Sequence, residues 1–232
     1  MANTIILWRH GQTDWNVQNK FQGHTDIPLN AVGEYQVVHA ARLVVDMNPT
    51  AIISSDLSRA RNTAQALSTI NGLPISIDAR LRETNCGKWE GLTGEEIRAI
   101  DHENLKEWSL GGDNPAGGTG DRRSEVGARA KAAIEDFLRD KDGQTLVVAT
   151  HGGTARSIIG MYLDLPIPYW SKIGGLSNAS WSVLTDTPKG WLLTEHNAGS
   201  IPEPLLGVES GASTTSEARG QDGAAVIPDS IR

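Results

Sequence analysis

The sequence predicts a three-layer α/β/α protein in which helices cover both faces of a mostly parallel central sheet. Three short runs rich in β-branched and other apolar residues, at 4–8, 51–54 and 145–150, are typical of buried strands. Each run precedes a longer segment whose apolar residues recur at helical spacing, and this alternation favours parallel strands. With 232 residues, 38% of them hydrophobic and 21% charged, the chain is long enough to bury one such core.

Further strands are expected after the second helix and at the end of the ordered part of the chain. Residues 75–77 form a short β-branched run. Residues 177–184 and 190–195 flank Pro188-Lys189 and predict a closing hairpin.

Four helices are predicted from the periodicity of their buried faces. Asn30 is expected to cap the first helix, which ends at Asn48-Pro49, and Ser55-Asp56 to cap the second, with Arg59 in its first turn. The four buried faces are Val37, Ala41 and Val44; Ala60, Ala64 and Leu67; Val126, Ala130, Ala133 and Phe137; and Ala155, Ile158, Ile159 and Tyr162.

The remaining segments are expected to be loops or short helices. Residues 13–28 and 81–91 hold unusual polar residues and predict functional loops. Residues 93–108 predict one or two short helices with a solvated charged face, and the Gly-rich residues 111–120 an exposed, mobile loop.

We expect one domain, residues 1–198, followed by a disordered tail, residues 199–232. The tail is rich in Gly, Ser, Ala, Thr, Pro and acidic residues and has no periodic apolar pattern. An ordered extension that docks through Ile201, Leu205 and Leu206 is the alternative.

Charge and cysteine content narrow the partners and the compartment. The formal net charge of −7 argues against nucleic-acid binding and against binding to an anionic membrane. A single cysteine, Cys86, excludes an intramolecular disulfide and suits a reducing compartment. Neither a leader peptide nor an apolar run of membrane-spanning length is recognisable, so we expect a cytoplasmic protein. A homodimer is compatible with the sequence.

Two of the predicted strands run directly into a histidine and a glycine. Arg9-His10-Gly11 follows the first strand, and His151-Gly152 follows the strand at 145–150. In open α/β sheets the carboxyl ends of the strands form the ligand site, and a glycine there lets the backbone approach an anion closely. The two histidines can therefore converge on one site.

If these residues converge with Arg59 and Glu83, they suit phosphoryl transfer. Two guanidinium groups and the N–H groups of helix starts, at Gly11 and Gly152, match a phosphate dianion. A neutral imidazole can attack phosphorus. A carboxyl group such as Glu83 can then protonate the leaving alkoxide.

Other chemistries have weaker support. A zinc site built from His10, His151 and Glu83 is conceivable, but no His-x-x-x-His or Cys-x-x-Cys spacing accompanies it. The chain has neither a Gly-x-Ser-x-Gly elbow nor a P-loop. The other histidines, His24, His39, His102 and His196, are expected to be solvated or hydrogen-bonded, and Trp89, Trp170 and Trp181 to serve packing.

The motifs together resemble the histidine phosphatase superfamily, the phosphoglycerate-mutase-like proteins, over about residues 4–196. The matching segments are Arg9-His10-Gly11, Asn16, 54–60 (Ser-Ser-Asp-Leu-Ser-Arg-Ala), Leu81-Arg82-Glu83 and Thr150-His151-Gly152-Gly153. This resemblance implies a phosphohistidine at His10, a phosphate pocket of Arg9, Asn16, Arg59 and His151, and Glu83 as proton donor. It implies no metal and no cofactor.

Within the superfamily, residues 82–84, 89–93 and 174–181 and the Gln22-Gly23 step look most like glucosyl-3-phosphoglycerate phosphatases. Gln22 would then be a further substrate contact. The chain departs from many relatives at Gly117–Ser124, where Gly-Gly-Glu-Ser is replaced, so the acidic residue and the helix cap are altered on the substrate side of the site.

We therefore expect a phosphomonoesterase that hydrolyses a small phosphorylated metabolite. A phosphoglycerate mutase of the same fold is the alternative, but it needs a longer enclosing insertion than the 67 residues, positions 84 to 150, that separate Glu83 from His151. A non-catalytic phospholigand-binding protein is a further alternative. The retention of every catalytic residue type argues against it.

Overall fold

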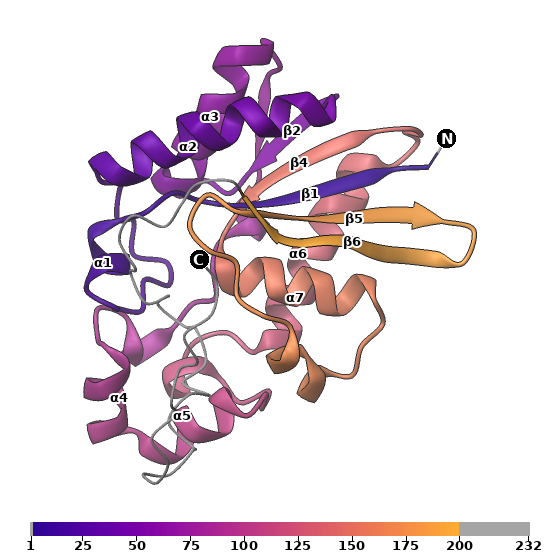
Figure 1. The fold of residues 1–232 in the computed structure, drawn as a ribbon. Helices are drawn as coiled ribbons and strands as arrows, with labels where there is room; N and C mark the ends of the chain where they lie inside the picture. Colours follow the sequence, from indigo (N-terminus) through magenta and orange to yellow (C-terminus); the bar gives the residue numbers. More distant parts are fainter. Residues whose placement is uncertain (1, 200–232) are drawn as a thin grey trace, which may run out of the picture.

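The computed structural model describes residues 2–199 and confirms the predicted α/β class (Figure 1). Within these residues six strands form one sheet in the order β3-β2-β4-β1-β5-β6. The strands are β1 (Thr4–Arg9), β2 (Ala51–Ser54), β3 (Ile75–Ile77), β4 (Thr145–Thr150), β5 (Trp181–Thr187) and β6 (Gly190–Ala198). The first four strands in this order are mutually parallel, whereas β5 and β6 are antiparallel to their neighbours.

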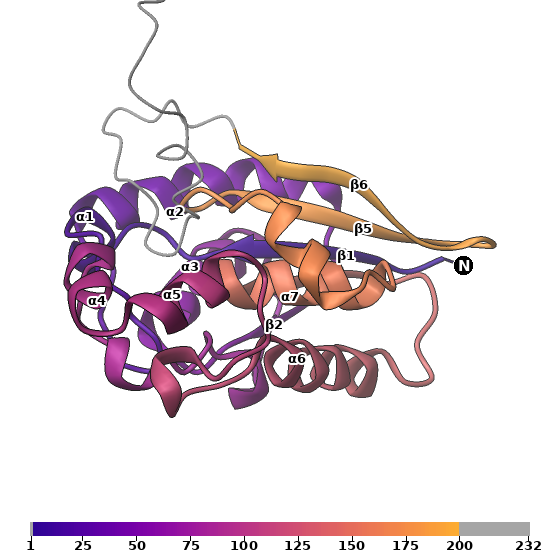
Figure 2. The ribbon, with the colours of Figure 1, turned by 90° about the horizontal axis from the view of Figure 1, so that it is seen from below.

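Helices cover both faces of the sheet, which gives the three predicted layers (Figures 1 and 2). One layer contains α2 (Ala31–Val44) and α3 (Ser58–Asn71), and the other contains α6 (Arg123–Leu138) and α7 (Gly152–Tyr162). The short helices α1 (Asp14–Val17), α4 (Gly94–Ile100) and α5 (His102–Ser109) lie beyond one end of the sheet. No helix of residues 2–199 combines the length and the apolar character needed to cross a membrane.

The alternation of side chains along β1 explains why two layers of helices are needed. Ile5 and Leu7 pack with α6 and α7, whereas Ile6 and Trp8 pack with α2 and α3. All four side chains are fully buried. A strand that is apolar on both faces must be covered on both faces, as in parallel sheets.

The cap of α2 is as predicted, but the cap of α3 is not. The side chain of Asn30 accepts a hydrogen bond from the N–H of Gly33. Helix α3 begins at Ser58, and its first N–H donates to the Asp26 carboxylate at 2.8 Å instead of to Ser55 or Asp56. The capping group comes from a loop 32 residues earlier, so local sequence could not reveal it.

Two loop predictions and the bounds of the closing hairpin also need correction. Residues 13–28 contain the one-turn helix α1, which Thr13 and Asn16 stabilise through a capping box. The closing hairpin starts at Trp181 and extends to Ala198. Residues 111–120 are not an exposed loop throughout, because Ala116 is fully buried in a small cluster with Cys86, Trp89 and Ile97. Their small side chains allow close packing: a Cβ on Gly117 would lie 2.4 Å from the carbonyl oxygen of Cys86.

Residues 200–232 of the predicted tail lie outside the described residues, as do the docking residues of the alternative. The boundary between the domain and the tail therefore stays a prediction.

The ends of β1 and β4 are the point at which the chain leaves the sheet in two directions. The connection after β1 runs through α2 to β2, and the connection after β4 runs through α7 over the opposite face to β5. Such a switch point leaves a crevice beyond the carboxyl ends of the two strands, where ligands of α/β proteins bind.

We predict that Gly33→Ala destabilises the fold by about 2 kcal/mol or more, because it overpacks the contact that positions the segment after β1. A Cβ at Gly33 would lie 2.0 Å from the carbonyl oxygen of Gln12, which is backbone and cannot swing aside. Gly94→Ala is the matched control, since no atom lies within 4 Å of its added Cβ, and it should change stability by no more than about 1 kcal/mol. Urea unfolding of both variants measures this, and equal midpoints would contradict the packing argument.

Candidate active site

The parallel pairing of β1 with β4 brings the two predicted histidines together. Arg9 is in register with Thr150, so the residues that follow, His10 and His151, leave the sheet side by side. The N–H of His10 donates to the carbonyl oxygen of Thr150 at 3.0 Å. The two imidazole ring centroids are 5.3 Å apart, and both rings are buried.

A cavity lies at this point and contains six of the nine predicted site residues in its wall. These are Arg9, His10, Gln22, Arg59, Glu83 and Gly152. Asn16, Gly11 and His151 lie outside the wall.

The hydrogen bond of His10 identifies its reactive nitrogen. Nδ1 lies 2.7 Å from the carbonyl oxygen of Gly11, which can only accept, so Nδ1 carries the proton and Nε2 carries the lone pair. Burial, together with the positive charges of Arg59 and Arg9, holds the pKa of His10 well below its usual value of 6.5. His10 is therefore neutral at neutral pH and can act as a nucleophile through Nε2.

Arg59 is a fixed, buried positive charge in the first turn of α3. Its two terminal nitrogens donate to the carbonyl oxygens of Thr25 and Gly23, each at 2.9 Å, and its Nε donates to Nδ1 of His151 at 3.2 Å. Burial lowers the pKa of Arg59 to about 10, so the side chain remains charged at neutral pH. Its geometry is set before any ligand arrives.

His151 is turned toward a hydroxyl group. Because Nδ1 accepts a hydrogen bond from Arg59, the proton is on Nε2, which donates to Oγ of Ser55 at 2.9 Å. Burial and the charge of Arg59 lower the pKa of His151 well below its usual value. In this arrangement His151 orients Arg59, which lines the cavity, but does not line the cavity itself.

Glu83 is held at the N-terminus of α7. Its carboxylate accepts hydrogen bonds from the N–H groups of Gly153 and Thr154, both at 3.0 Å, from the hydroxyl group of Thr154, and from its neighbour Thr84 at 2.8 Å. Such N–H groups attract a negative charge to a helix N-terminus. Oε2 accepts a single one of these hydrogen bonds, from Gly153, and thus has free capacity to bind a proton.

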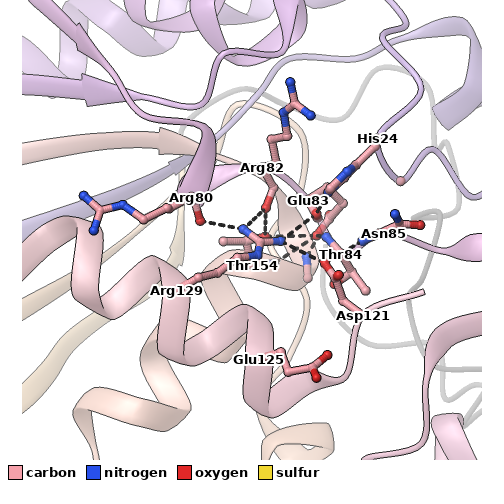
Figure 3. Close-up of polar contacts among 12 residues, drawn as sticks. His24, Arg80, Arg82, Glu83, Thr84, Asn85, Asp121, Glu125, Arg129 and Thr154 are labelled. Carbon is pink, nitrogen blue, oxygen red and sulfur yellow. Dashed lines mark hydrogen bonds and ion pairs between the residues drawn. The ribbon is translucent and has the colours of Figure 1, made fainter. Parts of the chain in front are cut away.

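The main chain at Glu83 is clamped by two side chains that the sequence did not single out as part of the site (Figure 3). Its carbonyl oxygen accepts from Nε2 of His24 at 2.9 Å and from Arg129 at 2.8 Å. Arg129, on α6, also donates to the carbonyl oxygens of Arg80 and Arg82. No local sequence pattern marks Arg129, eight residues beyond Asp121, as part of the site, because its main-chain contacts join α6 to a loop that is distant in the chain.

The altered segment Gly117–Ser124 still supplies an acid, and Asp113, just before the segment, caps the helix that follows. Asp121 accepts from Arg129 at 3.2 Å and from the N–H of Asn85 at 2.9 Å (Figure 3). Asp113 accepts from the N–H and the hydroxyl of Ser124, in the first turn of α6. The departure from the family pattern therefore leaves the support of the Glu83 loop in place.

The same segment places a further cation in the cavity wall. Arg123 lies 3.9 Å above the ring of Trp108, and both residues line the cavity together with Arg156 of α7. Burial, followed by the nearby charge of Arg156, lowers the pKa of Arg123 to about 10. Neither arginine was predicted from the sequence to be part of the site, because a charged residue in an amphipathic helix is normally exposed.

The other predicted ligand contacts have varied surroundings. Gln22 is in the cavity wall, and its Oε1 is buried without a hydrogen-bond partner in residues 2–199. Asn16 accepts through Oδ1 from Thr13 and Asn178. The N–H of Gly11 donates to the Thr63 hydroxyl, and a Cβ there would lie 2.5 Å from the Gly33 carbonyl oxygen, so this glycine serves close packing on α2.

The first residue of α7, Gly152, lies in the cavity wall. Its N–H is the first of the helix and so has no intrahelical acceptor. In residues 2–199 no three His, Cys, Asp or Glu side chains are placed to hold a metal ion together, so the zinc hypothesis has no support from the described geometry.

Comparison with known proteins agrees with this geometry. The sequence profile of the histidine phosphatase superfamily, branch 1, matches residues 5–199. The chain belongs to the histidine phosphatase superfamily. The predicted resemblance and fold are thereby confirmed.

Individual relatives of this histidine phosphatase are similar over most of its length. A glucosyl-3-phosphoglycerate phosphatase of Mycobacterium tuberculosis is 35% identical over 192 residues, which cover 79% of this chain and 86% of that protein. A solved structure of a mycobacterial glucosyl-3-phosphoglycerate phosphatase with VO3 has a TM-score of 0.79 and 34% identity, covering 84% of this chain and 99% of that one. A probable phosphoglycerate mutase of Yersinia enterocolitica is 32% identical over 188 residues, 81% of this chain and 87% of that protein. The predicted enzyme class, a phosphatase, is confirmed by these similarities.

We predict that the two buried histidines make this histidine phosphatase less stable as the pH falls below about 6.5. Above this value both imidazoles are neutral in the folded and the unfolded chain. Below it the unfolded chain takes up protons that the folded protein, in which both pKa values are lowered, resists. The free energy of unfolding should therefore fall by up to about 1.4 kcal/mol per pH unit for each histidine.

Urea unfolding between pH 5 and 7.5 measures this slope, which His10→Gln should flatten. His39→Gln removes an exposed histidine and is the matched control. An unchanged slope in the His10 variant would show that the acid sensitivity arises elsewhere.

Proposed function

We propose that this histidine phosphatase hydrolyses a phosphomonoester of a small metabolite through a phosphohistidine at His10, with glucosyl-3-phosphoglycerate as the first choice of substrate. The observation that carries the proposal is the neutral imidazole of His10, which lines the cavity, has its lone pair on Nε2, and is subject to the positive charges of Arg59 and Arg9. The presence of His10 and Glu83 together with Arg9 and Arg59 in the wall of one cavity argues against a protein that merely binds phospholigands.

In the first step Nε2 attacks phosphorus, and the bond from phosphorus to the ester oxygen breaks. The leaving alkoxide takes a proton from Oε2 of Glu83 and departs as an alcohol. In the second step Glu83 accepts a proton from water while the water oxygen attacks the phosphohistidine. The nitrogen–phosphorus bond then breaks, which releases phosphate and restores His10.

The phosphoryl group is bound by positive charge and by a helix N-terminus. Arg9 and Arg59 supply two guanidinium groups in the cavity wall, and Gly152 supplies the first N–H of α7. His151 acts by holding Arg59, with which it shares a hydrogen bond. Asn16 acts indirectly: it accepts a hydrogen bond from Asn178, which holds the segment after β1 in place.

The choice of substrate is supported by the names of the relatives. Those named glucosyl-3-phosphoglycerate phosphatase are similar over most of this chain. The similarity to a probable phosphoglycerate mutase keeps isomerisation as the second candidate. Incubation with 3-phosphoglycerate distinguishes the two activities: free phosphate supports hydrolysis, and 2-phosphoglycerate formed faster than phosphate would replace the phosphatase proposal with a mutase.

We predict that brief reaction with a labelled phosphate ester leaves acid-labile, base-stable phosphate on the protein. The label should disappear in His10→Ala, because the attacking nitrogen is removed, and persist in His102→Ala, whose imidazole is exposed. Rapid quench followed by gel autoradiography measures it. Labelling that survives in His10→Ala would assign the nucleophile to another residue.

A second prediction concerns the proton donor. Glu83→Gln should lower kcat/KM at least about 100-fold for alkyl phosphates, whose leaving groups need a proton. It should lower kcat/KM far less for p-nitrophenyl phosphate, whose leaving group departs as a stable anion. Steady-state kinetics measure both, with exposed Glu34→Gln as control. An equal loss on both esters would mean that Glu83 acts only by holding α7.

A further inference from the structure

The cavity carries more positive charge than a phosphate group needs. Among the described residues its wall contains four arginines, Arg9, Arg59, Arg123 and Arg156, and one carboxylate, Glu83. The charges of Arg59 and Arg9 both act on the imidazole of His10. Arg123 and Arg156 are thus surplus to the phosphate group.

Arg123 is built into the wall. It is 7% exposed, its guanidinium group lies over the ring of Trp108, and one terminal nitrogen donates to the carbonyl oxygen of Trp108 at 2.9 Å. Its Nε is buried without a hydrogen-bond acceptor, and no carboxylate of residues 2–199 forms an ion pair with it. A buried charge in this condition is costly unless an anion joins it.

Arg156 adds a second charge of the same sign nearby. It is 9% exposed, and it is close enough for its charge to disfavour the protonated form of Arg123. A second positive charge nearby raises the cost of keeping Arg123 charged and buried, so an anion bound at Arg123 would offset that cost.

The spacing of Gly152 and Arg156 along α7 suits a short phosphorylated acid. Gly152 and Arg156 are four residues apart on one face of α7, about 6 Å along its axis. This is roughly the span of the four bonds, each of about 1.5 Å, between phosphorus and the carboxyl carbon of a 3-phosphoglycerate unit.

We propose that Arg123 and Arg156 form a second anion subsite that binds a carboxylate, so that the substrate is a phosphomonoester of a hydroxy acid. Guanidinium groups match a carboxylate as they match phosphate. The unpartnered Oε1 of Gln22 offers an acceptor for a substrate hydroxyl group in the same cavity. This inference rests on the proposed function, because it assumes that the phosphate group binds beside His10. It predicts that the enzyme prefers hydroxy-acid phosphates to sugar and polyol phosphates.

The test compares two esters that differ in the carboxylate, 3-phosphoglycerate and glycerol 3-phosphate. The full-length wild-type protein should prefer 3-phosphoglycerate at least about tenfold in kcat/KM, and Arg123→Gln and Arg156→Gln should each reduce this preference about tenfold or more. Arg122→Gln is the matched control, because this neighbour is exposed and does not line the cavity. A purely structural Arg123 would lower both rates together and leave their ratio unchanged.

Binding gives a second measurement that needs no turnover. Calorimetric Kd values of the two esters for the His10→Ala protein, with and without each arginine substitution, should show the same loss of preference. A wild-type preference below twofold, or a ratio that survives both arginine substitutions, would overturn the carboxylate subsite.

The two proposals fail in different ways. Absence of phosphate release from every ester, p-nitrophenyl phosphate included, would overturn the hydrolytic function, while the calorimetric ratio would still decide the subsite. Should Arg123→Gln not fold, the wild-type ratio and Arg156→Gln decide it alone.

Discussion

The parallel pairing of β1 with β4 is the constraint on which the site depends. Its register places Arg9 opposite Thr150, so that the next residue of each strand is a histidine. A slip of one residue would turn the side chains of β1 to the opposite faces of the sheet and would part the two rings. The burial of Ile5, Ile6, Leu7 and Trp8 on two separate cores opposes such a slip. The hydrophobic core therefore sets the catalytic geometry.

Once the register is set, burial and positive charge together determine the protonation of His10. Burial disfavours a proton on its imidazole most strongly, and the charges of Arg59 and Arg9 add to the same effect. The same guanidinium groups suit an incoming phosphate, so one set of charges keeps the imidazole neutral and draws the electrophile toward it. The bonds from Arg59 to Thr25, Gly23 and His151 fix this charge beforehand, which avoids reorganisation during the reaction.

The sequence predicted the features that arise from local periodicity and from motifs at strand ends. The strands before His10 and His151, the inner faces of four helices and the Asn30 cap all follow from short-range patterns. The errors and omissions come from contacts between distant segments. Asp26 caps α3 across 32 residues, Ala116 is buried by elements folded over it, and Arg123 points into the cavity from a helix start that looks like protein surface. No pattern within a short window contains this information.

Helix α6 connects the Glu83 loop to the cavity wall. Arg129 on this helix clamps the main chain at Glu83, and Arg123, less than two turns earlier, lines the cavity over Trp108. Asp121, just before the helix, bonds to Arg129 and to the N–H of Asn85 in the Glu83 loop (Figure 3). A displacement of this helix start would therefore move Glu83 and Arg123 together. If Glu83 is the proton donor and Arg123 binds the carboxylate, as we propose, recognition of one end of the substrate is linked to the position of the group that protonates its leaving oxygen.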